Sequence, residues 1–447
     1  MQNKNNILIY AFFVTNCFGA DWTEIGSSTA MIGENMTDRA GASVALSADG
    51  KTVAFGQPGW STVTGRVEIF KFNGSNWVQV GSSIDGETAG DSAGTSVALS
   101  SNGQMVAVGE PGWNTTGRVR IFKFDGSNWT LVGLAIDGES LLDSAGNSVT
   151  LSSDGQTVAI GEPGWNIATG RVRVYKFNGS NWIQVGNSIN GENITDFAGF
   201  SVSLSANGKT IAFGEPYWEN GSGKGRVRVY KFDGNDWLQI GDAMNGENAS
   251  DFTGLSISLS ADGKTIAFGE PYWENGNQKG RVRVYRFDGS NWIQLGNSID
   301  GENLTDRAGA SVALSANGKM VAFGEPIWIN ANEIGRVRIY KFDGNNWIQV
   351  GNAISGENVT DQAGSSVSLS SKGKIVAFGE PAWVNGNEKG RVRIYENPYG
   401  TQDTTLQNQI LKFKPLNLSN LANHGATLEN MVPVYYLYSL ATKKSSL

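Results

Sequence analysis

Apolar residues along the chain fall into short runs, and a turn containing glycine separates each run from the next. One representative stretch predicts four β-strands, at 311–315, 320–324, 336–342 and 347–351. Asn317-Gly318 tolerates the positive φ angles of a type I′ turn, so the first two strands are expected to form a tight hairpin. Asp343-Gly344 predicts a second hairpin between the last two strands.

The third strand of the pattern alternates in a way that predicts burial of both its faces. In another copy, one face carries Arg281, Arg283, Tyr285 and Phe287, and the other carries Val282, Val284 and Arg286. Both faces therefore bear bulky side chains or long aliphatic stems. Each sheet is expected to lie between two neighbouring sheets.

The four-strand unit recurs seven times. The glycine before the first strand of each unit is Gly41, Gly94, Gly146, Gly199, Gly254, Gly309 and Gly364. The intervals between these glycines are 53, 52, 53, 55, 55 and 55 residues. A period near 50 residues with four short strands is typical of the blades of a β-propeller.

The two ends of the repeat array predict how it closes. The seventh unit stops after its third strand, near Tyr395, and lacks the fourth. Residues 21–26 match that missing strand and precede the first unit. The sequence therefore predicts an all-β fold over 21–399. It is a seven-bladed propeller of four-stranded antiparallel blades, closed by an N-terminal strand that pairs into the last blade.

The segments outside the repeats carry different signals. Residues 1–20 are expected to be a signal peptide, because Lys4 precedes the apolar run 7–14 and small residues follow. The alternatives are a membrane anchor through this segment, either lipidated at Cys17 or as an uncleaved signal anchor, and a buried N-terminal strand. Residues 400–447 are expected to form a C-terminal tail that is flexible or packs beneath the propeller.

Composition excludes several classes of function. A net charge of −7 gives no basic field for nucleic acid. One Cys and one His rule out a disulfide framework and a Cys/His zinc site, and His424, the single histidine, lies outside the repeats. No other apolar stretch is long enough to span a bilayer. No catalytic residue is assigned, and a monomer is expected.

Length variation between units is confined to the loop between the second and third strands. From Pro58 to Gly65, through Pro381 to Gly390, this loop spans 7, 6, 7, 9, 9, 9 and 9 residues. In a propeller this loop and the connection between units emerge on the same face. Variation on one face points to recognition. The alternative is that this loop, as the longest connection, simply tolerates changes in length most easily.

The 14 tryptophans divide into two sets of seven. The strand set is expected to pack between blades: Trp22, Trp77, Trp129, Trp182, Trp237, Trp292 and Trp347. The loop set begins each variable loop: Trp60, Trp113, Trp165, Trp218, Trp273, Trp328 and Trp383. These loop residues are the ligand-binding candidates, as aromatic platforms for a sugar or partner. The alternative is that each one pins its loop against the protein.

Each connection between units carries a Glu and an Asp four residues apart. The pairs are Glu34/Asp38, Glu87/Asp91, Glu139/Asp143, Glu192/Asp196, Glu247/Asp251, Glu302/Asp306 and Glu357/Asp361. The favoured reading is that the Asp fixes a turn by accepting backbone N–H groups. Calcium binding is the alternative, with Glu247, Asp251, Glu302 and Asp306 as candidate ligands; otherwise no cofactor is expected. Paired-carboxylate glycoside hydrolysis is disfavoured, because sevenfold repetition singles out no pair.

A second charge pattern predicts an ion pair between the second and third strands. A Glu closes the second strand and an Arg lies early in the third, as in Glu215 and Arg228. The first unit alone has Gln57 and Glu68 at these positions. Because the acid and the base disappear together, they are expected to face each other. A catalytic role for Glu68 is the minor alternative.

Units such as FAGFSVSLSANGKTIAFGEPYW (197–218) followed by GRVRVYKFDG (225–234) resemble FG-GAP repeats, the blades of integrin-alpha-type propellers. They are similar to repeats of secreted bacterial and algal propellers. The resemblance implies an extracellular propeller for adhesion or ligand binding. Integrin-type calcium sites use an Asp-rich loop between the first two strands; here that loop is as short as 48–51, so those ligands do not carry over.

The sequence thus predicts a secreted or cell-surface propeller that is not an enzyme. It would bind an extracellular protein or glycan partner on the face of the variable loops. The rival interpretation is a carbohydrate-active enzyme, a glycoside hydrolase or lyase, that uses carboxylates around the central channel.

Overall fold

The computed structural model describes residues 21–27, 31–219, 221–273, 278–328, 334–383 and 389–397. The expected signal peptide and C-terminal tail lie outside these residues. Within the described ranges, no helix has the length and apolar character needed to cross a membrane.

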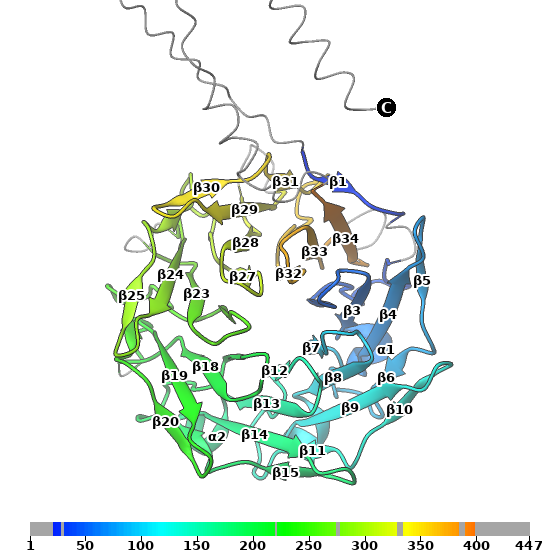
Figure 1. Cartoon of the computed structure of the whole chain (residues 1–447). Coiled ribbons are helices and arrows are strands. Elements are labelled where there is room, and N and C mark those ends of the chain that lie inside the picture. Colours follow the sequence, from blue (N-terminus) through cyan, green and yellow to red (C-terminus); the bar gives the residue numbers. More distant parts are fainter. Residues whose placement is uncertain are drawn as a thin grey trace, which may run out of the picture. The chain divides into compact units, whose positions relative to one another are not determined.

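The described residues form seven antiparallel sheets, which Figure 1 shows arranged as a ring. Blade 1 contains β2 (Ser43–Leu46), β3 (Thr52–Gln57), β4 (Arg66–Phe72), β5 (Trp77–Gln79) and β6 (Ile84–Asp85). Blade 2 contains β7 (Ser96–Leu99), β8 (Met105–Glu110), β9 (Arg118–Phe124), β10 (Trp129–Leu131) and β11 (Ile136–Asp137). Blade 3 contains β12 (Ser148–Leu151), β13 (Thr157–Glu162), β14 (Arg171–Phe177), β15 (Trp182–Gln184) and β16 (Ile189–Asn190).

The remaining four blades repeat this plan. Blade 4 contains β17 (Ser201–Leu204), β18 (Thr210–Glu215), β19 (Arg226–Phe232), β20 (Trp237–Gln239) and β21 (Met244–Asn245). Blade 5 contains β22 (Ile257–Leu259), β23 (Thr265–Glu270), β24 (Arg281–Phe287), β25 (Trp292–Gln294) and β26 (Ile299–Asp300). Blade 6 contains β27 (Ser311–Leu314), β28 (Met320–Glu325), β29 (Arg336–Phe342), β30 (Trp347–Gln349) and β31 (Ile354–Ser355). Blade 7 contains β32 (Ser366–Leu369), β33 (Ile375–Glu380), β34 (Arg391–Glu396) and β1 (Thr23–Glu24).

The four strands of a blade, here called A to D, follow one another from the centre of the ring outward (Figure 1). The predicted seven-bladed propeller is confirmed. The two-residue strand after the D strand of blades 1 to 6, such as β6, pairs with strand C beside it and was not predicted. Short helical turns α1 (Trp60–Val63), η2 (Trp113–Thr115) and α2 (Trp165–Ala168) occupy the B-to-C loops of blades 1 to 3.

The A-to-B hairpin differs from the predicted type I′ turn. Only Gly318 has a positive φ, of 65°, and Asn317 does not. The Gly318 N–H donates to the Ser315 carbonyl at 2.9 Å, and the Asn317 side-chain oxygen accepts the Lys319 N–H at 3.0 Å. The turn therefore closes on a single left-handed glycine, which the local hydrogen bonds of the Asn side chain support.

The ring closes as predicted through the N-terminal strand. β1 pairs antiparallel with β34, with Thr23 opposite Glu396 and Glu24 opposite Tyr395. The indole N–H of Trp22 donates to the Val350 carbonyl of blade 6 at 2.8 Å. The last blade is therefore shared between two distant parts of the chain, and β34 is paired on both sides, as strand C is in the other blades.

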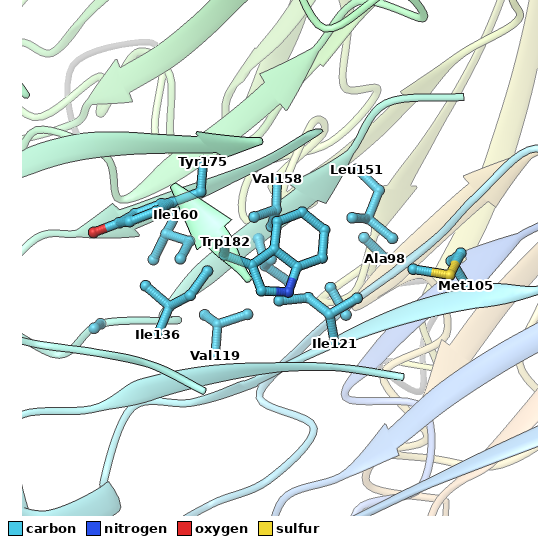
Figure 2. Packing of buried hydrophobic residues seen from close by; sticks show 13 residues of the cluster. Ala98, Met105, Val119, Ile121, Ile136, Leu151, Val158, Ile160, Tyr175 and Trp182 are labelled. Carbon is cyan, nitrogen blue, oxygen red and sulfur yellow. The ribbon is translucent and has the colours of Figure 1, made fainter. Parts of the chain in front are cut away.

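The strand tryptophans pack between blades. Trp182 is 5% exposed and contacts Val119 and Ile121 of blade 2 together with Val158 of its own blade (Figure 2). Its indole N–H donates to the Val132 carbonyl at 2.8 Å, and all seven strand tryptophans make this bond to the preceding blade. The predicted packing role of the strand set is confirmed.

Backbone hydrogen bonds also close a belt around the channel. The Ala48 N–H donates to the Ser101 carbonyl at 2.9 Å, and the Ser371 N–H donates back to the Ala48 carbonyl at 2.9 Å. Between them the same bond links Ser101 to Ser153, Ser153 to Ala206, Ala206 to Ala261, Ala261 to Ala316 and Ala316 to Ser371. The belt and the ring of leucines beside it, such as Leu46, line a channel cavity of about 170 Å³. Its lining residues are all Leu, Ala or Ser, so none of them carries a carboxylate.

Candidate functional site

The variable B-to-C loops and the D-to-A connections meet on one face, as predicted. The Ala93 N–H donates to the Thr64 carbonyl at 3.0 Å, and the Gly112 N–H donates to the Asp91 carbonyl at 3.2 Å. The Gly65–Ala93 bridge and its equivalents join each B-to-C loop to the connection that enters the next blade. We call the surface formed by these two sets of loops the loop face.

The Asp residues of the connections are buried and hold the turn. The Asp91 Oδ2 accepts the backbone N–H groups of Glu87 at 2.9 Å and Thr88 at 2.8 Å. The same two bonds recur at Asp143, Asp196, Asp251, Asp306 and Asp361. These contacts match the turn-fixing interpretation, since an Asp in this position satisfies backbone donors that strands leave free.

Calcium binding by Glu247, Asp251, Glu302 and Asp306 stays a prediction. Each Asp points one oxygen at its own turn, and each Glu carboxylate extends to an arginine: Glu247 to Arg281 at 3.1 Å and Glu302 to Arg336 at 2.9 Å. Among the described residues, no group of three or more His, Cys, Asp or Glu side chains is placed to hold a metal ion.

The predicted ion pair between strands B and C is confirmed and proves larger than expected. The Arg228 guanidinium donates to Glu215 at 2.6 Å. Arg226, not Arg228, stands directly opposite Glu215 in the ladder, and it also donates to this carboxylate. Arg226 further donates to Glu192 of the D-to-A connection at 2.9 Å. One fully buried Glu, two buried Arg and one half-exposed Glu thus form a network in blade 4.

Blade 1 shows the exception that the sequence had indicated. The Gln57 amide donates to the Glu68 carboxylate at 2.7 Å, in place of the Arg-to-Glu bond. Arg66 instead binds Asp85, with Nε at 2.7 Å from Oδ1. Ser83 also donates to Glu68, at 3.3 Å. Glu68 is 8% exposed, and burial raises the pKa of this carboxyl.

The loop tryptophans lie against the first arginine of strand C. The Arg226 guanidinium carbon is 4.9 Å from the centre of the Trp218 ring, within the range of a cation–π contact. The other pairs are Trp60–Arg66, Trp113–Arg118, Trp165–Arg171, Trp273–Arg281, Trp328–Arg336 and Trp383–Arg391. Six of these rings are half-buried, and Trp383 is 5% exposed. The rings therefore pin the loops over the arginine network, and their role as ligand platforms stays a prediction.

Sequence reasoning missed two sets of residues on this face. The first is the leading Arg of strand C, such as Arg226, whose repetition in every unit was a visible signal. The second is a group of aromatic residues in two units only, including Phe197 and Tyr217. Their signal was that no other unit carries an aromatic residue at either position, as at Ser144 and Gly164.

The ion pairs of the connection glutamates make stability depend on pH. The hydrogen bond from Arg171 lowers the pKa of Glu139, and the hydrogen bond from Arg281 lowers that of Glu247. A lowered folded-state pKa means that the unfolded chain binds more protons in acid. The stabilisation is therefore complete above the ordinary glutamate pKa of about 4.3 and is lost as the pH falls through the lowered value.

We expect Glu139→Gln to flatten the acid side of the thermal stability profile. The melting temperature of the unaltered protein should fall more steeply between about pH 5 and about pH 3 than that of the variant. The difference should be modest, because the Glu139 side chain is 57% exposed and solvent screens the pair. Differential scanning calorimetry across the pH range measures it. Parallel profiles for the two proteins would contradict the assignment.

Comparison with known proteins supports the fold alone. No protein-family model matches the chain, and no curated protein matches it either. Among solved structures, hydrazine synthase of Kuenenia stuttgartiensis is similar with a TM-score of 0.52 and 14% identity, over 81% of this chain and 96% of that one. A putative 6-phosphogluconolactonase from Bacteroides uniformis has a TM-score of 0.50 and 14% identity, over 71% of this chain and 86% of that one. At such identity neither activity carries over.

Proposed function

We propose that this protein is a secreted or cell-surface binding propeller without enzymatic activity, which recognises an extracellular partner on the loop face. The observation that carries the proposal is that the charged and the apolar side chains of that face have different environments. Its repeated carboxylates are held by arginines or by the turns, while apolar side chains at the tips of the connections stand in solvent. Those with large side chains are Met36, Leu141, Leu142, Ile194, Leu304 and Val359, each at least half exposed.

Two further points favour binding over catalysis. The resemblance to FG-GAP repeats suggests relatives used in adhesion, and we infer the same kind of use here. The channel cavity at the A-to-B hairpins is lined by Leu, Ala and Ser and carries no carboxylate. A glycosidase needs two carboxyl groups free to act as acid and as base or nucleophile. On the loop face, groups such as Glu215 and Glu192 are instead committed to arginines.

We expect Ile194→Asp with Leu304→Asp to weaken partner binding by about tenfold or more, because a buried unpaired carboxylate is costly at an interface. Binding is measured on arrays of immobilised glycans and extracellular-matrix proteins. The matched control is Ile183→Asp with Ile348→Asp, which alters equally exposed residues of the outer strands β15 and β30. Equal losses in both double variants would argue against the loop face. Turnover of a glycoside that Glu68→Gln abolishes would overturn the proposal.

A further inference from the structure

Four aromatic rings form a continuous strip across one sector of the loop face. Phe197 lies 4.9 Å from Tyr217, Tyr217 lies 5.0 Å from Phe252, and Phe252 lies 4.9 Å from Tyr272, between ring centres. The Arg307 guanidinium carbon ends the strip, 4.7 Å from the Tyr272 ring. We call the four rings the aromatic ladder. It joins the connections that enter blades 4 and 5 to the B-to-C loops of those blades.

The fold does not require the aromatic ladder, because other blades build the same backbone without it. Phe197 and Phe252 have φ angles of 55° and 54°, in the left-handed region that disfavours bulky side chains. The equivalent residue of blade 7, Gln362, has a φ of 57°. Where blade 4 has Tyr217, blade 7, whose B-to-C loop is equally long, has Ala382. The fold therefore needs no aromatic ring at either position.

The rings remain partly accessible. Each of the four is neither fully buried nor fully exposed, so each presents some of its surface to solvent. The ladder is one ring wide, which is far less than the roughly 800 Å² per partner that a stable protein interface buries. Its size suits a small ligand or the end of a chain.

Charges around the aromatic ladder argue against a cationic ligand. Two carboxylates near it in the described part of the chain are already paired with arginines, Glu192 with Arg226 at 2.9 Å and Glu247 with Arg281 at 3.1 Å. The Arg307 guanidinium already makes a cation–π contact with the Tyr272 ring. A second cation would meet repulsion and an occupied ring.

We infer that the aromatic ladder binds the pyranose rings of a neutral glycan, which names the ligand class for the proposed function and rests on it. The C–H face of a sugar ring is apolar and packs on an aromatic ring. The Tyr217 and Tyr272 hydroxyls supply donors and acceptors for sugar hydroxyls. The ligand-binding sector is then blades 4 and 5, and the other blades are scaffold.

The test is calorimetric titration of the full chain with neutral tetrasaccharides of β-linked glucose, mannose, galactose or N-acetylglucosamine, and with oligolysine. We expect a neutral saccharide to bind and oligolysine not to bind. Tyr217→Ala with Tyr272→Ala should weaken that binding by about tenfold or more. These changes follow Ala382, the equivalent residue of blade 7, so an unchanged melting temperature is expected. Tyr217→Phe with Tyr272→Phe retains the rings and should keep affinity within about threefold.

Several outcomes would overturn the inference. They are no neutral saccharide bound by the unaltered protein, equal affinity in the ring-deleting variant, or preferential binding of oligolysine. A partner found on the array could lose binding to the Ile194→Asp, Leu304→Asp variant but still bind the variant without the ladder rings. That result would refute ligand binding by the aromatic ladder and would be consistent with the proposed function. An unaltered protein that binds no array partner would count against the proposed function itself.

Discussion

Replacing Arg283 by Glu in blade 5 should destabilise the protein by about 3–5 kcal/mol, because a second buried carboxylate would then face Glu270. Glu270 is fully buried and accepts from both Arg281 and Arg283. Replacing Glu270 by Gln alone should cost a similar amount, about 3–5 kcal/mol, since it leaves two guanidinium groups without their shared counter-charge.

The double variant should cost much less than the sum of the single ones. Blade 1 shows why, because Gln57 and Glu68 occupy these positions there and hydrogen-bond at 2.7 Å. Blade 5 also has Ser298 and Asp300 where blade 1 has Ser83 and Asp85, the groups that bind Glu68 and Arg66. We therefore expect a favourable coupling of about 1–3 kcal/mol in a double-mutant cycle measured by urea unfolding.

Blade 4 provides the matched control for this cycle. Glu215→Gln with Arg228→Glu makes the same exchange, but Ala243 and Asn245 replace the serine and aspartate. The coupling there should be smaller, because the new carboxylate lacks a hydroxyl donor and Arg226 lacks an aspartate. Additive losses in blade 5 would refute the view that blade 1 is a working alternative to the Arg network.

The features that the sequence predicted well are those that local chemistry dictates. The glycine turns and the tryptophan of strand D are each encoded within about ten residues, and their repetition gives the period. The segment that contains Trp22 identified the missing strand, because it matches the strand D segments of the other units. The loop-length differences also placed variation on one face correctly, since a propeller's connectivity determines where its loops emerge.

The features that the sequence missed depend on residues brought together by folding. Arg226 rather than Arg228 stands opposite Glu215, and this follows from strand register, which a list of residue types does not contain. The loop tryptophans were offered as ligand platforms, but their packing on arginine depends on side-chain direction. The aromatic ladder joins Phe197, Tyr217 and Phe252 across two blades, and no linear motif spans them.

The closure of the ring leads to the second large effect, at Trp22. Trp22→Ala and Trp237→Ala should each destabilise the protein by about 3–5 kcal/mol, through the cavity left by the indole and the loss of its hydrogen bond. The two side chains are 7% and 6% exposed, and they donate to Val350 and Val185 at 2.8 and 2.7 Å. Urea unfolding of both variants measures the comparison.

Equal losses are the signature of a closed ring, because Trp22 directly precedes the two-residue strand β1, which pairs with β34. If that strand detached in solution, its tryptophan would be exposed already, and Trp22→Ala would cost no more than a surface change of about 0.5 kcal/mol. Thr23→Ala serves as the control, since the Thr23 side chain is exposed in the same strand. The contrary result would be a Trp22→Ala variant as stable as this control together with a strongly destabilised Trp237→Ala variant. It would show that β1 does not stay paired with β34 in solution.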